Sequence, residues 1–270
     1  MKLSKILLGA VAGAAVLGLV SCGGNDDPNA MIKGANKKYT IDYENDTADV
    51  SRGYKRTALQ HAGALVKLTF NEIGQTAGAT TNVYGGVLGC IFDLHTNDNG
   101  GKDFSVVGIQ NKNGVIKSYV STYTGVTNLQ AYNFGASTAA DATEGTEETV
   151  IQDFTVVSSS KIDTTDGANA VYVYFCETAT SDTDYDYNVY ILPKSVVDTL
   201  ANIKDADAGA LRNTDGDIVD ISSYKIATCD TSYTSLKQNN FAPYANVYAY
   251  SSVSGEWNIQ STYKEAEVIE

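Results

Sequence analysis

Residues 85–126 read GGVLGCIFDLHTNDNGGKDFSVVGIQNKNGVIKSYVSTYTGV and carry the clearest structural signal in the chain. Three runs rich in Val, Ile, Phe and Tyr alternate with two polar linkers, NDNGGKD and NKNG. The linkers supply the Asn, Asp and Gly residues that adopt the positive φ angles of tight hairpins. The stretch therefore predicts consecutive antiparallel strands at 83–94, 103–110 and 114–124.

The same pattern continues over the rest of the chain from Lys38 onward. About a dozen short strands with regular turns are typical of an all-β fold, here an antiparallel two-sheet sandwich that is jelly-roll-like. Outside the block above, the predicted strands are 38–44, 64–70, 128–134, 149–157, 170–178, 185–193, 223–228, 245–253 and 256–264.

One segment, PKSVVDTLANI at 193–203, departs from the strand pattern. Its apolar residues follow helical spacing behind a proline start, at Val196, Val197, Leu200 and Ile203. We expect one short helix that caps the end of the β structure.

Three polar stretches are expected to form loops, at 135–148, 158–169 and 204–217. The first is the best candidate for an internal boundary. However, the strands on both sides of it look alike, and no repeat stands out. We therefore predict a single β-sandwich domain over residues 37–265.

The block at 85–126 resembles the central strands of concanavalin-like and laminin-G-like jelly rolls, in which such a hairpin builds the concave sheet. The chain is also similar to jelly-roll lipoproteins of unassigned function from spirochaetes of the treponeme type. Such folds host both enzymes and binding proteins, so the fold alone does not fix the activity.

The resemblance to concanavalin-like enzymes implies a search for Glu-x-Asp-x-x-Glu, which would place two working carboxylates on one strand face. The nearest match, residues 44–49, ends in Asp and lies in a polar segment, so we interpret it as a solvated acidic turn. No Gly-x-Ser-x-Gly elbow or phosphate-binding glycine loop is present. The chain is predicted not to be an enzyme; a glycoside hydrolase with an unrecognised carboxylate pair is the alternative.

No cofactor is predicted. The sequence places no partners for a metal or general-base role beside the two histidines, His61 and His95, so each is interpreted as a hydrogen-bonded or exposed histidine. The loops HTNDNG and LRNTDGDIVD both fail the calcium-loop motif, because neither begins with Asp. Asp182, Asp184 and Asp186 alternate along one strand face, which favours a solvent-facing edge. A structural calcium site in irregular loops stays open.

Tyrosine is abundant, with 18 residues against seven Phe and one Trp. Tyrosine offers a flat apolar face and a polar hydroxyl, a combination suited to stacking on sugar rings and to protein contacts. We predict ligand-binding residues on a tyrosine-rich sheet face: Tyr119, Tyr123, Tyr172, Tyr174 and Trp257. The alternative is ordinary packing, since β-sheets favour tyrosine.

The N-terminus has a basic head with Lys2 and Lys5, followed by an uncharged run from Ile6 to Val20. That run is too short for a spanning helix, which needs about 20 residues, so residues 1–21 are interpreted as a removable signal peptide. Leu19-Val20-Ser21-Cys22 resembles the bacterial lipobox. The resemblance implies a mature chain that begins at Cys22 with acyl chains such as palmitate.

A flexible tether is predicted over residues 22–36, because GGNDD follows Cys22. In enterobacterial lipoproteins, an Asp directly after the acylated cysteine resembles a signal for retention at the inner membrane. This chain has Gly23 at that position, so we expect the protein at the outer membrane or cell surface. Beyond the signal peptide three cysteines remain, Cys90, Cys176 and Cys229. Whether they form a disulfide or are buried as small apolar residues is left open.

Acidic residues dominate the charge: 32 Asp and Glu stand against 19 Lys and Arg, a net charge of −13. The sequence shows no basic patch, so nucleic acid is not a predicted partner. The predicted function is non-enzymatic ligand binding by an envelope lipoprotein that contacts the bilayer through acylated Cys22. The predicted ligand is carbohydrate. In the alternative, the protein is a structural or adhesive lipoprotein that binds other surface proteins.

We predict that Cys22→Ala abolishes fatty-acid labelling and releases the protein from the membrane fraction, because the thiol is the acylation point. The measurement is metabolic labelling with fractionation, and Cys229→Ala serves as the matched control. Labelling that survives Cys22→Ala would contradict the anchor assignment.

Overall fold

The computed structural model describes residues 31–35, 37–45, 51–54, 63–75, 84–112, 115–126, 148–157, 159–165, 168–179, 185–201, 211–231, 241–247 and 251–261. Cys22, His61, the predicted strand at 128–134 and the aspartates at 182–184 lie outside these ranges. So does most of the predicted loop at 135–148.

The described chain consists mainly of strands. They are β1 (Lys33–Ala35), β2 (Lys38–Asn45), β3 (Ser51–Tyr54), β4 (Gly63–Gln75), β5 (Tyr84–Thr96), β6 (Lys102–Lys112), β7 (Val115–Val126), β8 (Glu148–Val156), β9 (Asn169–Ala179), β10 (Tyr185–Leu192), β11 (Lys225–Thr231), β12 (Ala242–Val247) and β13 (Ser251–Ser261). The helices are α1 (Lys194–Val197) and the 3₁₀ turns η3 (Ser159–Lys161) and η5 (Ser222–Tyr224). Within the described residues, no helix has the length and apolar character needed to cross a membrane.

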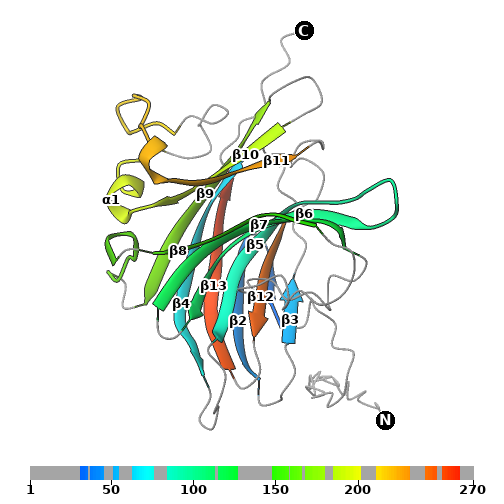
Figure 1. Ribbon diagram of the computed structural model, residues 1–270. Coiled ribbons are helices and arrows are strands. Elements are labelled where there is room, and N and C mark those ends of the chain that lie inside the picture. The colour runs from blue at the N-terminus through cyan, green and yellow to red at the C-terminus, as the bar shows by residue number, and fades with distance from the viewer. Residues whose placement is uncertain are drawn as a thin grey trace, which may run out of the picture.

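The described strands form two stacked antiparallel sheets (Figure 1). The seven-stranded sheet has the order β1-β2-β13-β4-β9-β10-β11, and the six-stranded sheet has the order β3-β12-β5-β6-β7-β8. The prediction of an all-β, two-sheet sandwich with one short helix is therefore confirmed.

The block at 85–126 forms three neighbouring strands, as its pattern predicts. β5 pairs with β6 and β6 pairs with β7, so that Val87, Gln110 and Lys117 lie side by side in one row. The C-terminal strands differ from expectation. The predicted strand at 245–253 is divided: β12 joins the six-stranded sheet, whereas β13 inserts between β2 and β4 in the other sheet.

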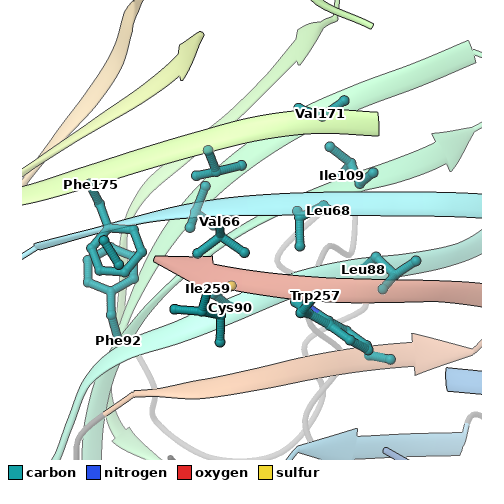
Figure 2. Packing of buried hydrophobic residues seen from close by; sticks show 14 of the residues in the cluster. Val66, Leu68, Leu88, Cys90, Phe92, Ile109, Val171, Phe175, Trp257 and Ile259 are labelled. Atoms are coloured by element: carbon teal, nitrogen blue, oxygen red, sulfur yellow. The ribbon is translucent and has the colours of Figure 1, made fainter. Parts of the chain in front are cut away.

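Alternating side chains of both sheets meet in the main core. In β2 the burial pattern alternates, with Tyr39 and Ile41 buried between exposed neighbours, because successive side chains of a strand point to opposite faces. Figure 2 shows side chains of β4, β9 and β13 facing those of β5 and β6. Phe92 and Phe175 stack with ring centroids 5.5 Å apart.

Trp257 links the two sheets at the centre of the core. It is 1% exposed, and its indole Nε1 donates a hydrogen bond of 2.8 Å to the carbonyl oxygen of Gly89 on the opposite sheet. This bond satisfies the single polar atom of the indole, which would otherwise be buried at a cost of about 1–3 kcal/mol.

A second apolar cluster lies on the outer side of β9 and β10. It joins sheet residues such as Tyr174 and Leu192 to Leu211 and Ile221 from the segment after β10. α1 is shorter than the predicted helix at 193–203. Pro193 occupies its N-cap, and the chain leaves the helix after Val197 because Leu200 forms a β-bridge with Asn213.

The sandwich begins earlier than expected. Met31 and Ile32 are buried in the main core, and β1 already pairs with β2, so residues 31–35 of the predicted tether belong to the folded domain. Cys90, Cys176 and Cys229, for which a disulfide was left open, are buried free thiols.

We predict that Gly255→Ala destabilises the fold by about 1–3 kcal/mol, the usual cost of overpacking a core. A Cβ at Gly255 would lie 2.5 Å from the Thr69 carbonyl oxygen and 2.9 Å from Leu88 Cδ1. Urea unfolding followed by tryptophan fluorescence measures the change. The exposed neighbour Glu256→Ala is the control, expected within about 0.5 kcal/mol of wild type; equal stabilities of the two variants would contradict the close approach.

Candidate functional site

Four of the five predicted ligand-binding aromatics are buried. Trp257 lies between the sheets, and Tyr123 is 2% exposed and stacks on Phe104 with centroids 5.1 Å apart. Tyr172 and Tyr174 share one strand face, as predicted, but that face belongs to the second apolar cluster. These four rings therefore serve as packing, the alternative that the composition left open.

The fifth residue, Tyr119, is placed only through its backbone. It pairs with Gly108 on β6 and with Phe154 on β8. Its side chain is outside the described part, so the structure brings together no stack of predicted aromatics that a ligand could reach.

The outer face of the six-stranded sheet is also closed where it is described. Strand alternation places one set of side chains on the side away from the main core, and six of these are at most 1% exposed: Val87, Ile91, Val106, Gln110, Tyr244 and Asn246. Lys117, in the row of Val87 and Gln110, is half-buried. In the other sheet, the second apolar cluster covers β9 and β10. Neither region offers an accessible sheet surface.

The accessible sheet surface that remains is the outer side of β1, β2, β13 and β4, called the open face below. Its exposed side chains are Lys33, Ala35, Lys38, Thr40, Asp42, Glu44, Glu256 and Gln260, and its half-buried ones are Lys67, Thr69, Ser252, Ser254 and Asn258. All of these except Ala35 carry a hydrogen-bonding or charged group. The alternation of KYTIDYE and EWNIQ is the sequence signal that could have identified this face.

Cross-strand register arranges the open face in rows. Lys38, Asn258 and Lys67 stand opposite one another on β2, β13 and β4, and Thr40, Glu256 and Thr69 form the next row. Side chains in one row are about 4.5–5.5 Å from their neighbours, close enough to contact one ligand together.

A polar cluster borders the open face where the second apolar cluster begins. The Lys67 Nζ lies 5.7 Å from the centroid of the Tyr172 ring, and the Tyr172 hydroxyl donates a 2.8 Å hydrogen bond to Asp163 Oδ2. Asp163 Oδ1 also accepts hydrogen bonds from the Thr165 amide and hydroxyl. These contacts hold the edge of the open face in one arrangement.

The surroundings of Asp163 keep its carboxylate ionised. Desolvation acts to raise the pKa, but hydrogen bonds from Thr165 and Tyr172 and the charge of Lys67 outweigh it and lower the pKa below its ordinary value of 3.8. A sequence-based search could not find this residue, because two of its partners, Lys67 and Tyr172, come from β4 and β9.

The two loops considered for calcium are closed by their own hydrogen bonds. In the β5–β6 turn, Asp103 Oδ1 accepts from Asn97 Nδ2 at 2.8 Å and from the Gly125 amide at 2.7 Å. His95 Nε2 lies 3.8 Å from Asp103 Oδ2. In the second loop, Asn213 Oδ1 accepts from the amides of residues 215 and 217. Among the described residues, no three His, Cys, Asp or Glu side chains are grouped to hold a metal ion.

The buried thiols lack the surroundings of a nucleophile. Burial raises the pKa of Cys176 to about 11 despite a hydrogen bond with Tyr174, and burial raises the pKa of Cys90 further. Both therefore remain protonated at neutral pH, whereas reactive cysteines depend on a lowered pKa.

No protein-family model matches the chain, and no curated protein matches its sequence. Among solved structures, the chain is similar to a legume lectin-like domain from Entamoeba histolytica, with 10% identity, coverage of 87% of this chain and 88% of that chain, and a TM-score of 0.41. It is also similar to the CBM2 module of the evolved Dit protein of Lactobacillus casei BL23 phage J-1, with 8% identity, coverage of 84% and 76%, and a TM-score of 0.30. Both scores are below 0.5, so the function proposed below rests on this chain's own residues.

We predict that Asp163→Asn lowers stability at neutral pH and that its deficit shrinks as the pH falls. A depressed pKa in the folded state contributes stability that is present above the unfolded value and lost as the pH falls through the folded value. The deficit should therefore be largest above about pH 5 and decline below 3.8. Thermal unfolding of both proteins from pH 7 to pH 2.5 measures it, with exposed Asp98→Asn as the control for loss of one charge. A deficit that is independent of pH would contradict the assignment.

Proposed function

We propose that the protein is a lipid-anchored envelope lipoprotein that binds carbohydrate without catalysis through the open face. The observation that carries the proposal is the row of hydrogen-bonding side chains formed by Lys38, Asn258 and Lys67 on three adjacent strands. Sugar hydroxyls both donate and accept hydrogen bonds, and this row with the neighbouring Thr40 and Glu256 offers both kinds of partner. The proposal moves the binding surface from the predicted tyrosines to this polar face.

Rigid support favours binding at this face. Strands position side chains more precisely than loops do, and Lys67 is further held by its contact with the Tyr172 ring. A preordered site loses less conformational entropy when a ligand binds.

The polar character of the open face argues against a protein partner at this surface. Protein interfaces have apolar, aromatic centres, whereas the single large apolar side chain that is exposed among the described residues is Ile218, which lies outside this face. The face therefore fits a hydroxyl-rich ligand better than an apolar protein surface.

The carboxylates of the open face support binding rather than hydrolysis. Asp42 and Glu256 occupy diagonal positions on β2 and β13, about 7–8 Å apart at their Cα atoms, and are therefore the neighbouring carboxylates to consider as a glycosidase pair. Both are exposed to water. A glycosidase general acid works in a sheltered, apolar pocket, and this pair has no such shelter.

The anchor would hold this face near the bilayer. Burial of Met31 leaves eight residues, 23–30, between the acylated cysteine and the sandwich, and eight residues reach at most about 29 Å. We place the protein at the outer membrane or cell surface on the grounds given for Cys22 and Gly23.

The proposal predicts that the mature chain is retained on at least one polysaccharide in a binding panel, and that Asn258→Ala weakens this binding about five- to tenfold. That change corresponds to loss of about one hydrogen bond to the ligand. Biolayer interferometry on immobilised polysaccharides measures it, with the thermal midpoint checked for each variant.

Asn99→Ala is the matched control, because Asn99 is an exposed asparagine on the β5–β6 turn of the other sheet. Equal losses for Asn258→Ala and Asn99→Ala would remove the open face from the binding role. Retention on no polysaccharide would overturn carbohydrate binding itself.

A further inference from the structure

The charges on the open face balance, although the chain as a whole is strongly acidic, with a net charge of −13. Among the described side chains of this face, the cations are Lys33, Lys38 and Lys67, and the anions are Asp42, Glu44 and Glu256. The open face is therefore close to neutral on the surface of an acidic molecule.

Strand register places opposite charges on neighbouring positions. Lys38 and Lys67 both pair with Asn258, and Glu256 lies two residues before Asn258 on β13. Glu256 is therefore diagonal to both lysines. Diagonal positions are about 7–8 Å apart at their Cα atoms, which long side chains can span. The carboxylate of Glu256 thus offsets the positive charge on either side of it.

The remaining contacts follow the same rule. Lys33 pairs with Thr40 and is therefore diagonal to Asp42, two residues further along β2. The charge of Lys67 also acts on the Asp163 carboxylate at the border of the face. Within the described residues, no lysine of the open face stands apart from a carboxylate. The face therefore has no cationic region that would attract a polyanion.

Uncharged hydrogen-bonding groups lie between these charges. Asn258 stands between the two lysines of its row, and Thr40 and Thr69 stand on either side of Glu256. A sugar hydroxyl can accept a hydrogen bond from an ammonium group and donate one to a carboxylate, and such charge-assisted bonds are about twice as strong as neutral ones. A neutral sugar gains these bonds without a charge of its own.

An acidic polysaccharide meets a less favourable surface. Its carboxylate or sulfate groups would lie beside Glu256 and Asp42 when they approach the lysines, and like charges at short range repel one another. The net charge of the whole chain adds to this repulsion at longer range.

We propose that the open face selects neutral polysaccharides and discriminates against acidic ones. The hydroxyls of the polysaccharide accept from the lysines and from the Asn258 amide, and they donate to Glu256. This inference rests on the proposed carbohydrate binding and names the class of ligand.

The test compares binding of the detergent-solubilised mature chain to two groups of immobilised polymers. The neutral group is dextran, mannan, galactomannan and amylose, and the acidic group is polygalacturonate and dextran sulfate. We expect retention on at least one neutral polymer and weaker or no retention on both acidic polymers.

A double variant, Asp42→Asn with Glu256→Gln, tests whether charge balance is the cause. It leaves three lysines against Glu44 on the open face, so binding to dextran sulfate should become about five- to tenfold tighter than for the wild type. Raising the salt from about 50 mM to about 500 mM should remove most of this gain.

Asp98→Asn with Asp215→Asn is the matched control. Both aspartates are exposed and lie outside the open face, so the control changes the charge of the whole chain equally and should gain less than about twofold. Circular dichroism melts check the folding of each variant.

The two proposals fail in different ways. Wild-type binding to an acidic polymer that equals or exceeds binding to every neutral one would overturn the selectivity and leave carbohydrate binding standing. So would an equal gain, or no gain, in the two double variants. Retention on none of the polymers would overturn both proposals.

Discussion

The hydrogen bond from the Trp257 indole to the Gly89 carbonyl oxygen joins the two sheets at the centre of the sandwich. Close approach at this point requires small residues, and Gly255 provides the room for Leu88. Because side chains alternate along a strand, fixing which residues face the partner sheet also fixes which face outward. A slip of one position in β13 would exchange Trp257 with Glu256 or Asn258. The polar surface of the protein is thus determined by the same register that builds its core.

That register divides the outer surface of the seven-stranded sheet into an apolar region and a polar region. The segment after β10 folds back over β9 and β10 and converts one half of a solvent-facing surface into a second apolar cluster. The other half remains polar and accessible. Asp163, Tyr172 and Lys67 lie on the boundary between these halves, where Tyr172 packs in the apolar cluster and its hydroxyl reaches a carboxylate. The boundary therefore combines apolar packing with charged groups.

Period-two alternation and hairpin linkers were sufficient to predict the fold class and the order β5-β6-β7, since both signals are local. The strand at 245–253 was assigned wrongly because β-branched and aromatic residues continue through the point where the chain passes between sheets. The predicted aromatic site could not be evaluated from composition, because tyrosine suits both a core and a surface. Lys38 and Lys67 are 29 positions apart in the sequence, and β13, from the other end of the chain, brings them into one row through Asn258.

The position of β13 has a consequence for how the chain acquires its structure. This strand follows every other described strand in the sequence, yet it lies between β2 and β4 near the middle of its sheet. During synthesis, β2 and β4 have no common partner until more than 250 residues have emerged. Contacts of such long sequence separation form slowly. The seven-stranded sheet is therefore completed only at the end of synthesis, when β13 joins the part built on β2 to the part built on β4.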